Sequence, residues 1–167
     1  MAHLLDDAFD HHVWATLVVL DVCTELTPEQ LASSVPGTYG SILDTLRHLV
    51  GSDNWYLHVI THGEVAEIDE DSMDLPQLRA AMEGFGPAWR SVLASAGDGS
   101  ADTVVHQEDG TAYHAPLSIR IAQALHHGTD HRSQICTGLT ALGIEPPGID
   151  LWAYGELTGI VREIPPA

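Results

Sequence analysis

The sequence predicts an all-α protein, a four-helix bundle with a small hairpin before its last long helix. Apolar residues recur at helical spacing in four long segments, and glycine and proline separate these segments. The chain has 167 residues, so we expect one domain over residues 1–167 whose core needs no disulfide or metal to hold it together. Four helices of about 20 to 27 residues in one domain are typical of a helical bundle.

The first long helix is expected over residues 3–25. Its apolar positions form a stripe near helical period, made of Leu4, Leu5, Ala8, Val13, Leu17, Leu20 and Leu26. Proline and glycine then interrupt the pattern and leave room for one short helical turn at residues 28–31. A second long helix is expected over residues 42–62, with Ser41 as its N-cap and Gly63 at its end.

The third long helix is expected over residues 75–95, with Asp74 as its cap. Gly84 and Pro87 lie inside it and are expected to kink it or split it in two. After the third helix the apolar residues no longer recur at helical spacing. Asp109 and Gly110 are suited to a tight turn, and they predict a hairpin. Apolar residues of the two expected strands flank this turn: Val104, Val105, Tyr113 and Ala115.

The fourth long helix is expected over residues 116–142, with Pro116 in its first turn and Gly143 after its end. A last short helix is expected over residues 150–159. About a dozen residues separate the second and third long helices, and such a segment can span about 40 Å when extended. It could cross the bundle and make these helices parallel, although its length does not require this.

Composition excludes several classes of partner. The formal net charge is −18, and the six basic residues are all arginine. Because phosphate binding needs a basic face, we expect no nucleic-acid partner and no anionic membrane surface. The sequence has neither a signal-peptide pattern nor an apolar run of about 18 residues, so a soluble, cytoplasmic protein is expected. Cys23 and Cys136 are expected to be core residues without a chemical role.

Three histidines lie in the stretch ALHHGTDHRSQI, residues 124–135. At about 100° per residue, His127 and His131 lie one turn apart at the edge of the apolar stripe, whereas His126 and Asp130 point roughly the other way. Two imidazoles at this spacing can share one metal ion at about 2.0–2.1 Å per nitrogen. A solvated, histidine-rich helix surface is the alternative, and the spacing alone leaves both open.

The second long helix carries three further histidines. His58 and His62 have the same spacing as His127 and His131, but they lie far from the apolar stripe and are expected to face solvent. His48 lies on a second face of the helix with hydroxyl residues and Trp55. It is either an exposed residue or a residue that points into a cleft with Trp55 as one wall.

Two residues in the stripe of the fourth helix need a reason to be there. Gly128 costs about 1 kcal/mol against alanine in a helix, which a close helix approach or access to a site would explain. A buried Arg132 needs a carboxylate, helix-end carbonyls or a ligand as its partner. Of these, a structural ion pair is favoured.

Two segments together resemble the DinB/YfiT-like superfamily of metalloenzymes: TLRHLVGSDNWYL at residues 45–57 and HHGTDHRSQICTGLTALGIEPPGIDLWAY at residues 126–154. The resemblance implies a bundle of up-down-down-up topology, often a homodimer. It also implies three histidines around one divalent ion, which fall on His48, His127 and His131. Zinc or nickel is the expected metal, and iron or manganese would also suit such a site. Asp130 and Ser133 depart from the HHRGQ pattern frequent in the family, and neither is an expected ligand.

Members of this superfamily include thiol S-transferases and a thiol-dependent isomerase, which use low-molecular-weight thiols such as bacillithiol or mycothiol. The resemblance therefore implies a metal-dependent S-transferase that acts on an electrophilic small molecule. Arg132 is then a candidate to orient a carboxylate of the thiol or substrate, and Trp55 a candidate to pack against its apolar part. One alternative is a hydrolase that uses metal-bound water, for which Asp44 and Asp53 flank His48 without sharing its phase. The other is a non-catalytic metal-binding or ligand-binding stress protein.

Overall fold

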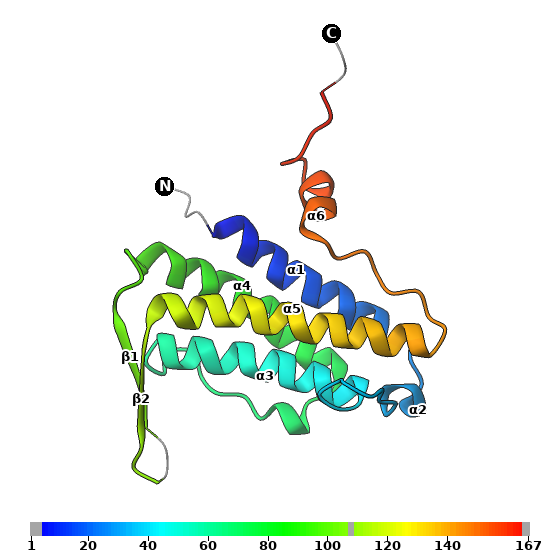
Figure 1. Ribbon diagram of the computed structural model, residues 1–167, viewed down its shortest axis with the longest axis horizontal. Coiled ribbons are helices and arrows are strands. Elements are labelled where there is room, and N and C mark those ends of the chain that lie inside the picture. Colours follow the sequence, from blue (N-terminus) through cyan, green and yellow to red (C-terminus); the bar gives the residue numbers. More distant parts are fainter. Residues whose placement is uncertain (1–4, 107–108, 165–167) are drawn as a thin grey trace.

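Four long helices dominate the computed structural model, which describes residues 5–106 and 109–164 (Figure 1). The chain is mostly helical with one small sheet, as predicted. The elements are α1 Asp6–Cys23, α2 Pro28–Leu31, α3 Ile42–Ile60, the 3₁₀ turn η1 Glu70–Ser72, α4 Leu75–Ser95, β1 Asp102–His106, β2 Ala112–Pro116, α5 Leu117–Ala141 and α6 Leu151–Leu157. No helix in the described ranges is long and apolar enough to cross a membrane.

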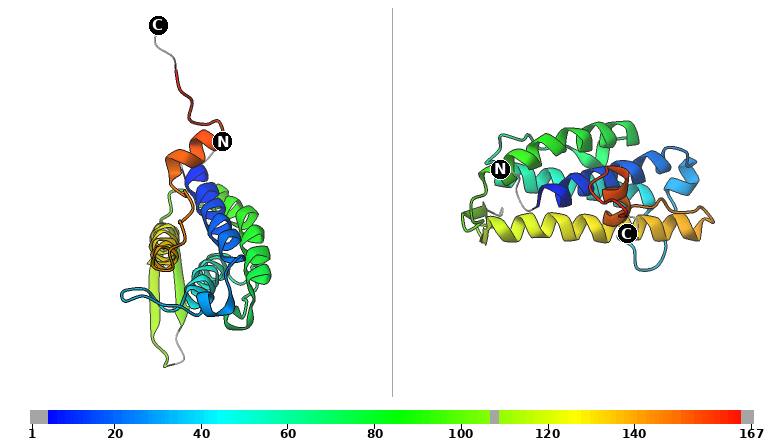
Figure 2. Two further views of the ribbon diagram at one scale, coloured as in Figure 1. Left: turned by 90° about the vertical axis from the view of Figure 1, so that its right-hand side faces the viewer. Right: turned by 90° about the horizontal axis from the view of Figure 1, so that it is seen from above.

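The long helices pack in pairs around one core. α1 packs on α4 and α5, and α3 packs on the same two helices, as the end-on view in Figure 2 shows. The largest fully buried apolar side chains come from all four helices, so the core is continuous between them: Phe9, Leu20, Leu46, Leu49, Leu57, Leu78, Met82, Trp89, Leu93, Ile135 and Leu139. The apolar stripes predicted for the second and fourth long helices are buried in α3 and α5, except that Leu125 is half-buried: Ile42, Leu46, Leu49, Val50 and Leu57 in α3, and Leu117, Ile121, Leu125, Ile135 and Leu139 in α5.

Polar caps fix where α3 and α4 begin. The Ser41 hydroxyl accepts the Asp44 N–H at 3.1 Å, and the Asp44 carboxylate accepts the Ser41 N–H at 3.2 Å. Asp74 and Gln77 form the same kind of reciprocal capping box at α4, so both predicted caps are confirmed. The cap of α3 matters for the site described below because it sets the register of His48 on that helix.

The first helix differs from its prediction. α1 is shorter than the expected range of residues 3–25, and residues 1–4 lie outside the described part of the chain. Its buried face contains His12 and Thr16, whereas Val13 and Leu17 of the predicted stripe are only half-buried. The helix is apolar around most of its circumference, so hydrophobic period alone could not identify the buried face.

Several element boundaries also differ from the predictions. α4 is one unbroken helix despite Pro87, so the expected split is wrong. The hairpin is confirmed, with Val104 paired to His114 and Val105 to Tyr113, although residues 107–108 of its loop lie outside the description. Pro116 occupies the N-cap position of α5, one residue before the first turn in which it was expected. The last short helix, α6, is two residues shorter at its C-terminal end than expected and begins after its cap, Asp150.

The segment between α3 and α4 runs back along α3 (Figure 1). The buried Asn54 side chain holds it by donating to the Ala66 carbonyl at 2.9 Å and accepting the Ile68 N–H at 3.0 Å. His58 is half-buried and donates from Nδ1 to the Val65 carbonyl at 2.9 Å, so the prediction that it faces solvent is wrong. His62 is exposed as predicted and follows the end of α3 with φ of 53°.

Candidate metal centre

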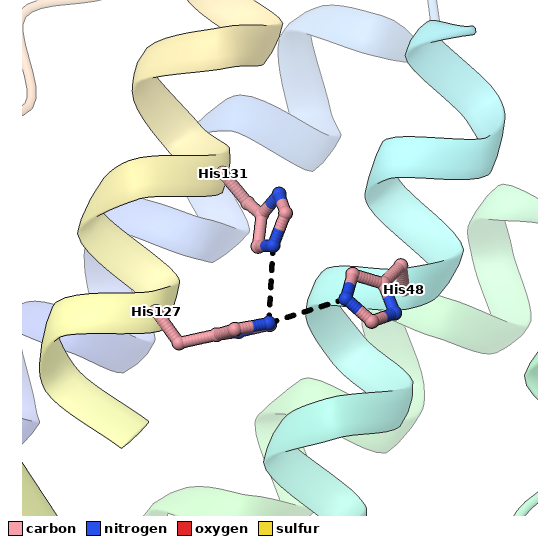
Figure 3. Close-up of side chains that lie close together, drawn as sticks. All are labelled: His48, His127 and His131. Atoms are coloured by element: carbon pink, nitrogen blue, oxygen red, sulfur yellow. Dashed lines mark hydrogen bonds between the residues drawn. The ribbon is translucent and has the colours of Figure 1, made fainter. Parts of the chain in front are cut away.

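Three histidines from two helices meet at one point (Figure 3). α3 contributes His48, and α5 contributes His127 and His131 from successive turns. Nε2 of His127 lies 3.2 Å from Nε2 of His48 and 3.0 Å from Nε2 of His131. Within the described parts of the chain, this is the one group of histidine, cysteine or acidic side chains whose ligand atoms cluster closely enough to hold a metal ion, all within 4.8 Å.

The spacing of these nitrogens fits a shared metal ion better than it fits hydrogen bonds. A neutral imidazole carries one proton, so Nε2 of His127 has either one N–H or one lone pair to offer to two neighbouring nitrogens. Two nitrogens that bind one zinc ion at about 2.0–2.1 Å with tetrahedral geometry lie about 3.4 Å apart. The three side chains could therefore hold a metal ion with little movement.

The three rings are held neutral. Burial lowers the pKa of His127 to about 4, and the nearby His131 and His48 rings contribute to the shift. Burial, followed by the His131 ring, also lowers the pKa of His48. Burial lowers the pKa of His131, while the charge of Asp130 opposes the shift. Near neutral pH, each ring therefore keeps a lone pair for a metal ion.

Tyr39 covers the histidine cluster. Its ring stacks on His48 at 4.0 Å between centroids with an interplanar angle of 3°, and it meets His131 edge-on at 5.6 Å. Its backbone N–H donates to Oε1 of Gln134 at 2.6 Å, so α5 holds the Tyr39 loop in place. The Gln134 amide in turn donates to Asp130 at 2.9 Å. These contacts fix the plane of the His48 ring.

The outer ring nitrogens have few polar partners. The Ser52 hydroxyl lies 3.5 Å from Nδ1 of His48, a distance at which it contributes little as a hydrogen bond. Nδ1 of His131 is buried, and no partner in the described chain reaches it with hydrogen-bond geometry, Gln134 included. Packing against Tyr39, more than hydrogen bonding, therefore orients these two rings.

A polar pocket of about 330 Å³ opens beside His48. Its walls are the loop before α3, the first turns of α3 and the η1 segment: Tyr39, Gly40, Asp44, His48, Glu70 and Asp71. Gly51 gives Glu70 room to approach α3, because a Cβ at residue 51 would lie 2.3 Å from Cδ of Glu70. Three carboxylates therefore line this pocket next to one histidine of the cluster.

The two candidate catalytic residues lie elsewhere. Trp55 is 36% exposed, and its ring contacts the Tyr56 ring at 5.1 Å between centroids. The Arg120 guanidinium lies 5.7 Å from the centroid of the Trp55 ring. Arg132 is 3% exposed and points toward α1. Neither residue lines the pocket beside His48.

Arg132 belongs to a buried network that connects all four long helices. Its Nη1 donates to Nδ1 of His12 at 3.1 Å, and Nε2 of His12 lies 3.0 Å from Oδ1 of Asp53. The Trp89 indole donates to Oδ2 of Asp53 at 3.0 Å. Because a guanidinium only donates, Nδ1 of His12 must accept and Nε2 must carry the proton that Asp53 accepts. The ion pair expected for Arg132 is therefore not formed directly in the described chain, because the His12 ring lies between its guanidinium and the Asp53 carboxylate.

Gly128 makes this network possible. A Cβ at residue 128 would lie 2.3 Å from Cε1 of His12 and 3.0 Å from Nη1 of Arg132. The close helix approach expected from the glycine is therefore the approach of α1 through its His12 ring. His126 and Asp130 are exposed, in agreement with the helical phase assigned to them.

The profile of the DinB family matches residues 1–164 of the chain. The protein belongs to the DinB family. The match covers α3 and α5 and therefore all three clustered histidines of this DinB protein. A comparison with curated proteins gave no significant match.

Two residues beside the histidine cluster, and one in the buried Arg132 network, were not found by sequence reasoning. Tyr39 lies in a loop and Glu70 in the three-residue 3₁₀ turn η1, and helical phase gives no information about neighbours in either segment. His12 lies on α1, on the same face as Ala15 and Val19. Because hydrophobic period did not identify the buried face of this helix, no sequence signal singled His12 out.

Proposed function

We propose that this DinB protein binds one divalent metal ion through His48, His127 and His131 and acts as a thiol S-transferase on an electrophilic small molecule. The observation that carries the proposal is the convergence of three neutral Nε2 atoms from α3 and α5. Three imidazoles leave the charge of the ion uncompensated and leave open positions for a further ligand. Zinc and nickel both suit such a nitrogen donor set.

When bound, such an ion lowers the pKa of a coordinated thiol or water molecule. In the proposed transfer, a carbon–sulfur bond forms as the bond from that carbon to the leaving group breaks, and the thiol proton passes to a base. Glu70 lines the same pocket as His48 and is the candidate base. Tyr39 shields the His48 ring on one face and offers an aromatic surface to the substrate.

The charge of the pocket beside His48 restricts the substrates. Asp44, Glu70 and Asp71 line it without a basic residue among the lining side chains. Carboxylates in this position repel anions, so the favoured thiol is neutral or carries an amine. A thiol rich in carboxylates is disfavoured.

A conjugation assay with thiols of different charge tests the S-transferase. Cysteamine, 2-mercaptoethanol and mercaptosuccinate would each be mixed with 1-chloro-2,4-dinitrobenzene and zinc-loaded or nickel-loaded protein, and thioether formation would be followed. We expect product with the first two thiols in wild type and in His126→Ala, and only the background rate in His127→Ala. Equal rates in all three proteins with every thiol would contradict the proposal.

A metal-dependent hydrolase is the second candidate, and the position of Glu70 favours it. A hydrolase needs a base beside the metal site, and Glu70 fills the space that Gly51 leaves open next to His48. A hydrolase predicts metal-dependent cleavage of an activated ester without thiol. The rate of cleavage should fall strongly in Glu70→Gln and little in Glu67→Gln. A non-catalytic binding protein instead predicts metal retention with neither product.

We also propose that the four long helices form the up-down-down-up bundle typical of the resemblance. The segment that returns along α3 before α4 begins supports parallel α3 and α4, as do the packing of α3 on α4 and of α1 on α5. A homodimer is proposed on the resemblance alone. Light scattering at several protein concentrations would test it.

A further inference from the structure

Arg132 is a buried cation whose direct partners are all uncharged. Its Nη1 donates to Nδ1 of His12 at 3.1 Å and to the Thr16 hydroxyl at 3.1 Å, and its Nη2 donates to the Thr129 hydroxyl at 3.2 Å. No described hydrogen bond engages Nε. Asp53, the nearest carboxylate of the network, is separated from the guanidinium by the His12 ring. A guanidinium in this position retains capacity for an anion.

A pocket of about 550 Å³ lies against this guanidinium. This open pocket lies between α1, the middle of α5 and the segment at the start of α6, and much of its wall is apolar: Ala8, Leu125, Cys136, Ile149 and Leu151. Arg132 is the one permanently charged cation among the lining residues, and Asp150 is the one carboxylate. Asp150 is engaged as the cap of α6, where it accepts the Ala153 N–H at 3.0 Å.

The segment that forms one wall of the pocket, residues 149–151, is attached to α1. His11 donates from Nε2 to the Ile149 carbonyl at 2.8 Å, and the Trp14 and Tyr154 rings pack with centroids 5.2 Å apart. These contacts hold residues 149–151 over the space between α1 and α5. The pocket is separate from the histidine cluster, because it lies on the α1 side of α5 and the histidines lie on the α3 side.

We propose that this pocket is a second binding site, which takes a small monocarboxylate with an apolar body and binds its carboxylate through Arg132. A bidentate contact with a guanidinium is the usual way in which a protein recognises a carboxylate. The apolar walls select the body of the ligand. Because the protein has a net charge of −18 and repels anions in general, a carboxylate without an apolar body binds poorly.

An NMR titration of the metal-loaded, ¹⁵N-labelled full chain tests this second site. Hexanoate is the probe, and hexanamide and acetate are the matched controls, since one lacks the charge and the other the apolar body. We expect hexanoate to shift the amide signals of Thr129, Ser133 and Cys136 and to bind at least about tenfold more tightly than either control. Ten-fold corresponds to about 1.4 kcal/mol.

Three variants show where the probe binds. Ser133→Phe fills the mouth of the pocket from an exposed position outside the network and is expected to abolish binding with little change in the melting temperature. Arg132→Gln keeps a donor for His12 and is expected to remove the preference for hexanoate over hexanamide. His127→Ala is expected to bind hexanoate as wild type does, because the site is independent of the metal.

Several results would overturn the second site. Hexanoate binding that disappears in His127→Ala would place the carboxylate at the metal, and binding that survives in Ser133→Phe would place it elsewhere on the surface. Equal binding of hexanoate and hexanamide would remove Arg132 from recognition. Absence of binding by hexanoate, and by benzoate as a second probe, up to about 10 mM would show that the pocket has no such function. All of these results are independent of S-transferase activity.

Discussion

His131 and Arg132 are consecutive residues of α5 whose side chains lie on different sides of that helix. Nε2 of His131 lies 3.0 Å from Nε2 of His127, in the cluster shared with α3. Nη1 of Arg132 lies 3.1 Å from Nδ1 of His12 on α1. One turn of α5 therefore serves both a candidate metal centre and a buried polar network, and mutations should separate the two roles.

Gly128→Ala is expected to destabilise the protein by about 1–3 kcal/mol, since the added Cβ overlaps a ring that cannot move freely. The His12 ring that it meets at 2.3 Å is fixed by Asp53 on one side and Arg132 on the other. Urea unfolding measures the change. Gly84→Ala is the matched control, because it is also helical but has no atom within 4 Å of its added Cβ. It should gain about 0.5–1 kcal/mol, and a loss of stability there equal to that at residue 128 would contradict the steric explanation.

Asp53→Asn is expected to lower the free energy of unfolding by about 3–5 kcal/mol. The amide can accept only through its oxygen, so the N–H of either His12 or Trp89 loses its acceptor, and the Arg132 charge stays buried without compensation. Asp10→Asn is the control, since it removes a surface ion pair with Arg90, which is 64% exposed. That change should cost less than about 1 kcal/mol. Equal losses in the two variants would mean that the buried network contributes little.

The metal-free protein is expected to lose stability as the pH falls from about 6.5 to about 4. The pKa of His127 is lowered from 6.5 to about 4 in the folded state, so in this window the unfolded chain binds more protons than the folded one. Uptake of protons by the unfolded chain favours unfolding, and the effect is absent above the unfolded pKa. Chemical denaturation at a series of pH values should show a shallower loss in His127→Ala than in His126→Ala. Parallel curves for the two variants would contradict the lowered pKa.

Gln134→Ala is expected to loosen the cover of the histidine cluster without removing a ligand. Gln134 is the partner of the Tyr39 N–H at 2.6 Å, and Tyr39 stacks on His48. We expect roughly ten-fold weaker metal binding, as is typical when a residue that orients a ligand is lost. Competition with a chelator measures it, with Gln123→Ala, on the same helix and exposed, as the control. Unchanged affinity in Gln134→Ala would show that the stacking does not orient His48.

Helical phase predicted α3 and α5 well because each has a clear apolar face. It assigned His127 and His131 to one side, His126 and Asp130 to the other, and the structure agrees. The same reasoning could not decide whether His48 was exposed, because that depended on α5 lying against its face. The three-histidine cluster followed from the resemblance and is brought together by the packing of α3 on α5.

The rest of the site depends on contacts between distant parts of the chain. His12 reaches Asp53 across 41 residues and Arg132 across 120, and a period measured within one helix has no information on such pairs. Tyr39 packs on the cluster from the loop before α3, where Gln134 accepts its backbone N–H. Glu70 lines the pocket beside His48 from η1, and Asn54 holds the segment that precedes η1. The partners of Gln134 and Asn54 could not be assigned before the helices were placed.

Metal content per chain tests the central claim most directly. Protein purified without a histidine tag and incubated with zinc or nickel would be freed of unbound metal and measured by elemental analysis. We expect close to one ion per chain in wild type and in His126→Ala, and a large loss in His48→Ala, His127→Ala and His131→Ala. Equal metal in wild type and the three cluster variants, or none in wild type after incubation, would contradict a metal centre on α3 and α5.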